Sequence, residues 1–332
     1  AKAQWDEGHE VSSRFGEPWL AAKLKQDPGH PLSAVLDSVL ANEAKLDSAV
    51  QEWFRELDAA TFDAFGVSHE TCELILRDLG SRPPELIWPQ MEGKSAEQKR
   101  MEHVWRLLSF CLKGVIEGDD DGIVPLVKCS NEAVLEERVL AELGKIAGTD
   151  RLHELEGEIA SELRKRVPGY KRADAIGDWL TNVYFEYHVR LYKKRPIYWH
   201  LASSQQTDPA FGVIVHYHRF GKDALRKLHG SYVRGCVERF ERELGQARKD
   251  NRTDDVVDLQ QRIDEVKAFD KKLQALDEGE PPIRVTWKDA AKQSKGWEPD
   301  IDDGVKVNIL PLQTAGLLRI PRVVSAASEE NE

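Results

Sequence analysis

Apolar residues in the first half of the chain recur at intervals of three and four, the spacing of one face of an α-helix. In residues 34–57 this stripe starts at Val35, Leu36, Val39 and Leu40. Further along, Gly66 breaks the pattern and Ser68 is placed as the N-cap of a second helix, which Gly80 ends. The apolar face of the second helix comprises Cys72, Leu74, Ile75 and Leu79. The segment is therefore predicted to form two helices separated by a break.

Another helix is predicted to begin at Ser95, with Glu97 and Gln98 in its first turn, and to end before the acidic loop at residues 118–122. The three successive aspartates of this loop raise the possibility of a calcium site. An EF-hand requires oxygen ligands at alternate positions, a glycine at the sixth position and a glutamate at the twelfth. No starting aspartate in the loop satisfies this spacing. A solvated turn is therefore the better interpretation of the loop.

The period of the pattern changes after residue 194. Residues 178–194 keep the helical spacing, whereas residues 195–201 and 211–220 are rich in aromatic and β-branched side chains. The segment between these two runs is polar. They are predicted to pair as an antiparallel β-hairpin.

Two charged helices are predicted to follow, at residues 222–249 and 253–276, and to fold back on each other because the turn between them is short. The apolar stripe of the first comprises Leu225, Leu228, Tyr232, Cys236, Phe240, Leu244 and Ala247, and that of the second comprises Leu259, Ile263, Val266, Phe269, Leu273 and Leu276. Beyond residue 279, the segments 283–288 and 305–310 alternate in polarity and are predicted to be short strands.

These patterns predict a fold that is mainly α with a small antiparallel β component. A helical, bundle-like domain is expected over residues 1–165, and a second domain over residues 166–332 holds the hairpin, the helical pair and a loop-rich C-terminus with short strands. A chain of 332 residues is long enough for two such domains. The four cysteines form no CxxC pair, no apolar run is as long as a membrane span, and the N-terminus lacks a signal-peptide pattern. A cytoplasmic location is therefore expected.

Charge is distributed unevenly along the chain, whose net charge is −11. Residues 164–234 contain 14 Lys and Arg against 5 Asp and Glu, a local charge of +9 that leaves −20 on the rest, and they hold five of the ten histidines. A basic island in an acidic protein indicates a surface that meets an anion. A solvated face with internal salt bridges is the alternative interpretation.

The cations of this island are interleaved with aromatic side chains, a mixture typical of nucleic-acid-binding surfaces. The six side chains predicted to contact phosphates are Lys193, Lys194, Arg195, Arg219, Arg226 and Lys227. The wider candidate set adds Arg164, Lys165, Arg166, Lys171, Arg172, Tyr198, Trp199 and His218. The core of the predicted hairpin is the favoured interpretation of the aromatic rings, and contact with nucleic acid is the alternative.

Motifs for catalysis do not occur in the sequence, which contains no GxGxxG, GxxxxGK[ST], GxSxG or HExxH. His200, His216 and His218 fall on the two strands of the predicted hairpin, where imidazoles could bind zinc, but the spacing fixes no fourth ligand. A metal-dependent nuclease built on these histidines would also lack the PD-x-[DE]-x-K and His-Asn-His patterns. No catalytic, cofactor-binding or metal-binding residue is assigned.

Several segments resemble those of a known family. KKRPIYW (193–199), FGVIVHYHRF (211–220) and PDIDDGVKVN (299–308) resemble segments that occur in this order, at comparable distances, in the C-terminal region of the PglX family. These are the large adenine-specific DNA methyltransferases of BREX phage-defence systems, and related fused restriction-methyltransferase enzymes share the pattern. AFGVS (64–68) is similar to the helix break that follows their target-recognition segments. The resemblance extends over residues 165–322 and, less closely, over residues 45–130.

The resemblance implies a part in DNA modification without catalysis by this chain. Family enzymes bind S-adenosylmethionine on a Gly-rich turn and hold the flipped adenine at an [ND]PP[YF] motif, and neither motif occurs here. This chain is therefore expected to hold no cofactor and to grip double-stranded DNA in support of target recognition, while the parent enzyme uses S-adenosylmethionine. Its expected partners are DNA, a methyltransferase core in cis or in trans and other defence-system subunits, but no membrane. The alternative is a protein-interaction module that docks such a core or another subunit.

Overall fold

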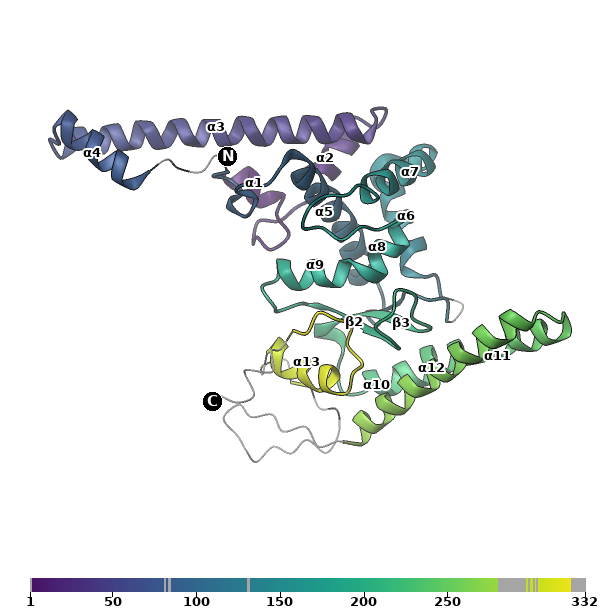
Figure 1. The fold of residues 1–332 in the computed structure, drawn as a ribbon. Coiled ribbons are helices and arrows are strands. Elements are labelled where there is room, and N and C mark those ends of the chain that lie inside the picture. Colours follow the sequence, from purple (N-terminus) through teal and green to yellow (C-terminus); the bar gives the residue numbers. More distant parts are fainter. Residues whose placement is uncertain are drawn as a thin grey trace. The chain divides into compact units, whose positions relative to one another are not determined.

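The chain divides into two compact units (Figure 1). Unit 1 comprises residues 1–110 and 143–172, and unit 2 comprises residues 111–142 and 173–332. The predicted fold class, mainly α with a small antiparallel β component, is confirmed. No helix in the described part of the chain has both the length and the apolar character needed to cross a membrane. The computed structural model describes residues 2–323 apart from 81, 83, 84, 130, 131, 280–296, 298, 301 and 303.

Unit 1 is helical throughout its described part. Its elements are α1 (Lys2–Glu7), α2 (Trp19–Gln26), α3 (Leu32–Ala64), α4 (His69–Leu79), a 3-10 turn (Pro89–Met91), the first part of α5 (Ala96–Glu117), the last part of α6 (Leu135–Ala147), a 3-10 turn (Thr149–Arg151) and α7 (Leu152–Leu163). The predicted start of α5 is confirmed by a capping box. Its Ser95 Oγ accepts a hydrogen bond from the Gln98 N–H (3.3 Å), and the Gln98 Oε1 accepts one from the Ser95 N–H (2.8 Å).

Part of the core of unit 1 forms where α2 packs on the first half of α3. Val35, Leu36 and Val39, three of the four apolar positions that open the predicted stripe, are buried. Further along α3, Leu46 and Val50 pack against a cluster of Trp5, Ile87, Trp88 and Met91. Beyond Val50, no described residue of α3 or α4 is buried. The hydrophobic core of unit 1 therefore ends halfway along α3.

The predicted break between α3 and α4 is confirmed, but α4 leaves its apolar face uncovered. Gly66 has φ 61°, and the Ser68 Oγ accepts a hydrogen bond from the Thr71 N–H (3.3 Å), as an N-cap does. Leu74 and Leu79 on the predicted apolar face are 48% and 74% exposed. The pattern thus predicts the helix correctly, while no element in the described part of unit 1 buries the apolar face that the pattern defines.

Unit 2 surrounds a small sheet with helices. The strands are β1 (Ile123–Pro125), β2 (Tyr198–Ala202) and β3 (Gly212–His216), in the order β1-β3-β2. Beside the last part of α5 and the first part of α6, the helical elements are α8 (Ile176–Asn182), α9 (Tyr184–Leu191), a 3-10 turn (Tyr217–Arg219), α10 (Ala224–Lys227), a π-helical turn (Leu228–Val233), α11 (Arg234–Lys249), α12 (Thr253–Glu278) and α13 (Val305–Thr314).

The predicted hairpin is confirmed as β2 and β3, which pair antiparallel with Trp199 opposite Val215. β3 ends at His216, so the last residues of the predicted strand form the 3-10 turn instead. The third strand, β1, pairs with the other edge of β3 and was not predicted, since three residues carry too little pattern. α9 covers one face of the sheet and α10, α11 and α12 cover the other (Figure 1). The sheet is therefore buried on both faces.

The predicted antiparallel helical pair is confirmed as α11 and α12, with α10 and the π-helical turn continuous with α11. All seven predicted apolar positions of the first helix are buried, as are five of the six in the second, where Leu259 is partly buried. Gly235 allows a close approach, because a Cβ there would lie 2.6 Å from the backbone oxygen of Cys129. The lack of a side chain at Gly235 therefore lets α11 pack closely against the segment that follows β1.

Residues 305–310 do not form the predicted strand and instead begin α13. The alternation of β-branched residues there also fits a helix, in which Asn308 and Leu312, one turn apart, are buried. The buried side-chain amide of Asn308 donates a hydrogen bond to the hydroxyl of Tyr217 (2.9 Å), as buried polar groups generally require. The other predicted C-terminal strand, residues 283–288, lies outside the described residues.

Candidate nucleic-acid interface

Three of the predicted phosphate contacts, Lys193, Lys194 and Arg195, form the turn between α9 and β2. α9 ends in a Schellman motif, in which the Lys194 N–H donates to the Val189 oxygen (2.8 Å) and the Lys193 N–H donates to the Arg190 oxygen (3.2 Å). Lys193 therefore takes the position where helices usually carry glycine. Lys193 and Lys194 have φ values of 50° and 62°. This left-handed backbone costs a residue with a Cβ roughly 1–2 kcal/mol, so the turn is strained.

The side chains of this turn are free to meet an anion. All three are exposed, and no carboxylate among the described residues lies within ion-pair distance of them. The turn lies beside the end of β3, because the Tyr217 N–H donates to the Ile197 oxygen (2.8 Å). The next residue, His218, is also exposed. The cationic turn and a potential imidazole donor thus share one end of the hairpin.

His188 on α9 fixes the end of this turn at which β2 begins. Its Nε2 accepts hydrogen bonds from the N–H groups of Ile197 (3.1 Å) and Tyr198 (3.2 Å). Burial lowers the pKa of His188 to about 3. The ring must be neutral to accept these bonds, so burial and geometry favour the same protonation state. His188 therefore joins α9 to β2 across the cationic turn.

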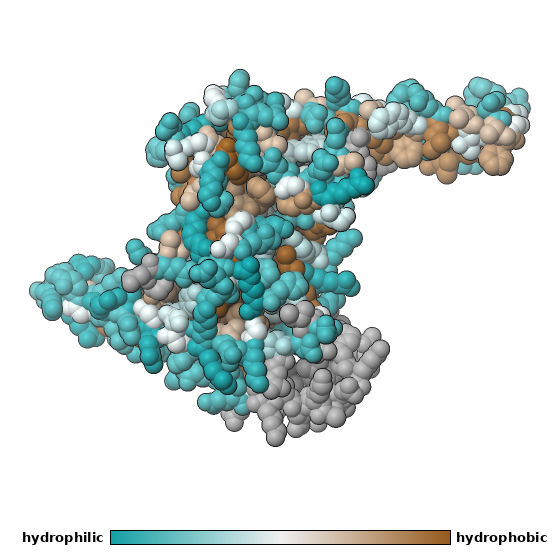
Figure 2. All heavy atoms as spheres, turned by 180° about the vertical axis from the view of Figure 1, so that it is seen from behind, coloured by the Kyte–Doolittle hydropathy of each residue, from teal (hydrophilic) through white to brown (hydrophobic). Residues whose placement is uncertain are grey.

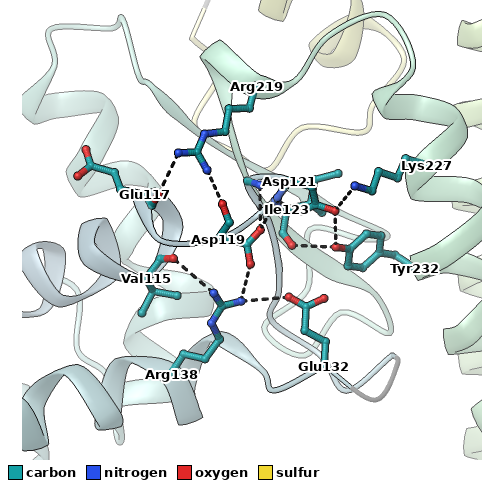
Figure 3. A network of polar contacts seen from close by, with 11 residues as sticks. Val115, Glu117, Asp119, Asp121, Ile123, Glu132, Arg138, Arg219, Lys227 and Tyr232 are labelled. Carbon is teal, nitrogen blue, oxygen red and sulfur yellow. Dashed lines mark hydrogen bonds and ion pairs between the residues drawn. The ribbon is translucent and has the colours of Figure 1, made fainter.

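Arg219, another predicted phosphate contact, is engaged in a polar network inside unit 2 (Figure 3). Its guanidinium donates to the backbone oxygens of Glu117 (2.9 Å) and Asp119 at the C-terminal end of α5. Arg138 on α6 donates to the carboxylates of Asp119 (2.7 Å) and Glu132 (3.0 Å) in the same network. Together the two arginines hold the loop that leads from α5 into β1. The donor groups of Arg219 are therefore already engaged by this loop.

Asp121 anchors the other end of this loop (Figure 3). Its carboxylate lies 2.6 Å from the Lys227 Nζ and accepts a hydrogen bond from the Tyr232 hydroxyl (3.0 Å). Burial opposes ionisation of Asp121, but its hydrogen bonds, with that from Lys227 the strongest, lower its pKa overall. The solvated-turn interpretation therefore holds only for the exposed Asp120, and is wrong for Asp119 and Asp121, which brace the loop.

Sequence reasoning missed the structural roles of Arg138, Glu132 and Tyr232 in this network. Tyr232 and Asp121 are 111 positions apart, and no local pattern relates them. The loop sequence did contain one usable indication. Asp119 accepts hydrogen bonds from the backbone N–H groups of Asp121 (3.2 Å) and Gly122 (2.8 Å), as in an Asx turn. An aspartate followed three residues later by glycine indicates such an ordered turn.

Arg226 is paired but accessible. Its guanidinium lies 3.0 Å from the Asp277 carboxylate and 3.6 Å from that of Asp223, and its side chain is 64% exposed. Ion pairs of exposed side chains are weak because water screens them, so a phosphate can compete for this arginine. Arg226 is therefore a weaker candidate than the unpaired turn and a stronger one than Arg219 or Lys227.

The remaining basic candidates, residues 164–172, belong to unit 1 and follow α7. Lys165 pairs with Glu162 (2.6 Å). The exposed candidates of this segment are Arg164, Lys165, Arg166, Lys171 and Arg172. The basic island of the sequence is thus divided between the two units, one part after α7 and the other around the hairpin.

Tyr198 and Trp199 are fully buried, so these two candidates lie in the core of the hairpin and not on a surface open to nucleic acid. The Tyr198 ring stacks on His188 at 5.1 Å, and the Trp199 ring lies 4.9 Å from Tyr217. The two side chains point to opposite faces of β2. Because helices cover both faces of the sheet, both rings lie in the interior. The hairpin-core interpretation of these rings is confirmed.

The histidines considered as zinc ligands are not gathered into a site. His200 is fully buried against Phe185 on α9, and neither ring nitrogen has a hydrogen-bond partner in the described chain. Burial lowers the pKa of His200 to about 3. His218 lies beyond the end of β3, in the 3-10 turn. Within the described ranges, no group of three His, Cys, Asp or Glu side chains could hold a metal ion.

No protein-family model matches the chain. It is 27% identical over 207 residues to the adenine-specific methyltransferase BrxX of Escherichia coli O9:H4 (strain HS), a match that covers 57% of this chain and 16% of that enzyme. It is 25% identical over 173 residues to the adenine-specific methyltransferase PglX of Lacticaseibacillus casei (strain Zhang), covering 48% and 13%. The matched stretches span less than a fifth of either relative. The predicted resemblance to PglX-type enzymes is confirmed.

Proposed function

We propose that this relative of the adenine-specific methyltransferases is a non-catalytic, DNA-gripping portion of an N6-adenine DNA methyltransferase in a phage-defence system of the BREX or restriction-modification type. The observation that carries the proposal is the turn of Lys193, Lys194 and Arg195, with three consecutive exposed cations and no carboxylate partner in the described chain. Cationic side chains on phosphates supply affinity for any DNA sequence. The turn would grip and orient the duplex while bases are read elsewhere.

The contrast among the six basic candidates supports the turn as the principal contact. Arg219 and Lys227 already hold partners within unit 2. Lys193, Lys194 and Arg195 have no side-chain partner among the described residues, and Lys193 and Lys194 occupy a backbone conformation that glycine would adopt at lower cost. Such strain persists at sites where function requires a side chain. His218 and Arg226 would add secondary contacts.

Catalysis in the proposed enzyme belongs to a methyltransferase core outside this chain, joined in cis or acting in trans. The core would bind S-adenosylmethionine and the flipped adenine, for which this sequence lacks the Gly-rich turn and the [ND]PP[YF] motif. The matched stretch is only 16% of BrxX, which leaves ample length for a core in the relatives. The proposal therefore assigns this chain to substrate binding.

Fluorescence anisotropy with a labelled duplex tests the proposal directly. The full chain is titrated against a duplex of about 30 base pairs at several salt concentrations, beside the variant Lys193→Glu/Lys194→Glu/Arg195→Glu. We expect the variant to bind about tenfold or more weakly to every duplex, with a log–log salt slope smaller by about 3, since each phosphate contact contributes about 0.9.

A matched control separates the turn from a general effect of charge. The variant Lys249→Glu/Lys271→Glu/Lys272→Glu reverses three exposed cations on α11 and α12 and changes the net charge equally. It is expected to bind within about threefold of the wild type, because distant charges are screened at physiological salt. Equal losses in both variants, or no loss in the turn variant while its fold survives, would remove the turn from the DNA-binding surface.

A further inference from the structure

The second half of α3 and α4, residues 48–80, form an uncovered helical surface that we term the arm. Ten large hydrophobic residues are exposed in the described chain, and seven of them lie on the arm. These seven are Trp53, Leu57, Phe65, Leu74, Ile75, Leu76 and Leu79. Hydrophobic side chains gather along this segment at the upper right of Figure 2. Apolar exposure concentrated in this way marks an interaction surface.

The exposed stripe on α3 continues a buried one. Leu46 and Val50 pack against the tryptophan cluster of unit 1, and Trp53 and Leu57 follow at spacings of three and four on the same helical face. Trp53 is 55% exposed and Leu57 is 59% exposed. One apolar face is thus covered at its beginning and left open for its remaining turns. This spacing is the one with which helices insert into apolar grooves.

The arm is held in shape without a partner. The Arg82 guanidinium donates two hydrogen bonds to the Asp58 carboxylate (2.7 and 3.1 Å) and lies 4.6 Å from the centroid of the Phe54 ring. This contact returns the chain after α4 to α3, and the Ser68 cap orders the start of α4. The apolar stripe is therefore preorganised, which reduces the entropy that binding would otherwise cost.

The negative charge of the arm limits the kinds of partner that can bind it. Residues 48–80 contain seven acidic and two basic side chains, a net charge of −5. That sign repels DNA and anionic lipid surfaces, and two arms packed face to face would repel each other. A protein with an apolar groove bordered by lysine and arginine is complementary to the stripe and to its acidic rim.

We infer that the arm docks on the methyltransferase core through such a basic-rimmed groove. The identity of the partner rests on the proposed function, because a core must accompany a DNA-gripping portion that cannot methylate alone. The cationic turn lies in unit 2 and the arm in unit 1. DNA and the core therefore engage different elements of the chain, and the two interactions can be removed one at a time.

The test is a titration of the labelled core of the same enzyme, expressed as its own polypeptide, with the full chain. The variant Trp53→Gln/Leu57→Gln removes the stripe at exposed positions, and the control Ser48→Gln/Ala59→Gln places two glutamines at exposed, uncharged positions on the opposite face of α3. Burial of either apolar side chain is worth more than a factor of ten in affinity. We expect the stripe variant to raise the Kd at least about tenfold and the control to change it by less than about threefold.

Circular dichroism and DNA anisotropy on both variants check that the fold and DNA binding are intact, so that a loss of core binding can be assigned to the stripe. The stripe variant is expected to keep wild-type helicity and wild-type DNA affinity. Equal core affinity of the wild type and the stripe variant overturns the inference. Self-association of the chain that Trp53→Gln/Leu57→Gln abolishes would assign the arm to a second copy and also overturn it. Core binding through the arm by a chain that binds no DNA would refute the proposed function alone and leave the docking surface standing.

Discussion

The α11–α12 pair in unit 2 and the arm in unit 1 have similar amphipathic sequences and opposite environments. Phe240 and Phe269 on the apolar stripes of α11 and α12 are each 1% exposed. Trp53 and Leu79 on the arm are 55% and 74% exposed. Both segments are helical where the pattern predicts helices, so the periodicity of apolar residues determines the secondary structure in each case. Only tertiary contacts decide whether the apolar face is buried.

The difference shows what an uncovered amphipathic face means. α11 and α12 bury their stripes against each other and under the sheet, as the contact between Phe269 on α12 and Phe211 illustrates. The arm has the same kind of stripe, a folded backbone and a helix cap, but no covering element in the described part of unit 1. The apolar stripe of α11–α12 stabilises the fold, whereas that of the arm is available for binding.

The largest expected effect on the free energy of unfolding comes from truncating a buried side chain in the α11–α12 pair. Phe269 lies 5.1 Å from Phe211 between their ring centroids and is almost completely buried. Phe269→Ala is expected to lower the free energy of unfolding by about 3–5 kcal/mol, since it loses buried area and leaves a cavity. Urea unfolding followed by circular dichroism measures the loss.

The matched substitution in the arm is Leu57→Ala, which removes a leucine that is 59% exposed. We expect a change below about 0.5 kcal/mol, as for surface substitutions away from packing or polar networks. A loss of several kcal/mol from Leu57→Ala would mean that the arm packs within this chain, and the comparison between the two regions would fail.

The sequence predicted local features well and distant pairings poorly. The stripe from Leu225 to Ala247, the hairpin and the capping box at Ser95 follow from spacing within one element, and all are confirmed. The short strand β1 and the helix α13 were missed, because three residues carry little pattern and alternating β-branched residues fit two periods. The segment from Tyr198 to Trp199 shows the same limit for the site, since aromatic residues fit both a core and a binding surface.

The state of the cations was the least predictable part of the site. Lys193 and Lys227 look alike in sequence, since each stands next to another basic residue. Lys227 pairs with Asp121, which is 106 positions away in the chain, whereas Lys193 has no carboxylate partner among the described residues. Only the tertiary structure distinguishes a cation that braces a loop from one that is free to bind a phosphate.

Acid is expected to destabilise the packed sheet through its buried histidines, a vulnerability that the arm, which buries no residue, does not share. Burial lowers the folded-state pKa of His188 and of His200 to about 3, from an ordinary value of 6.5. Between these values the unfolded chain binds protons that the folded chain does not. The stability that each neutral ring contributes is present above pH 6.5 and is lost as the pH falls, by about 2 kcal/mol per histidine between pH 7 and pH 5.

His200→Leu isolates one of these contributions, because neither ring nitrogen of His200 has a hydrogen-bond partner in the described chain to lose. The fall in the free energy of unfolding from pH 7 to pH 5 is expected to be about 2 kcal/mol smaller in the variant than in the wild type. Urea titrations at the two pH values measure this difference. An unchanged fall would show that His200 does not resist protonation in the folded state.

Two helix ends in the chain, those of α3 and α9, have the same hydrogen bonds. At the end of α3, the Gly66 N–H donates to the Asp63 oxygen (3.0 Å) and the next N–H donates to the Phe62 oxygen (2.9 Å). α9 ends with this arrangement too, but Lys193 stands where α3 has Gly66, at φ 50° against 61°. Glycine adopts this backbone without the steric cost that a Cβ brings.

Lys193→Gly is therefore expected to raise the free energy of unfolding by about 1 kcal/mol and, at the same time, to weaken DNA binding and reduce the salt slope by about 0.9. Gly66→Ala, where no atom lies within 4 Å of the added Cβ, is expected to lower stability by about 1 kcal/mol through the backbone alone and to leave DNA binding unchanged. Urea unfolding and anisotropy on the two variants measure both quantities. If Lys193→Gly stabilised the protein without weakening DNA binding, the strained lysine would have no part in the grip, and the turn would be an ordinary helix end.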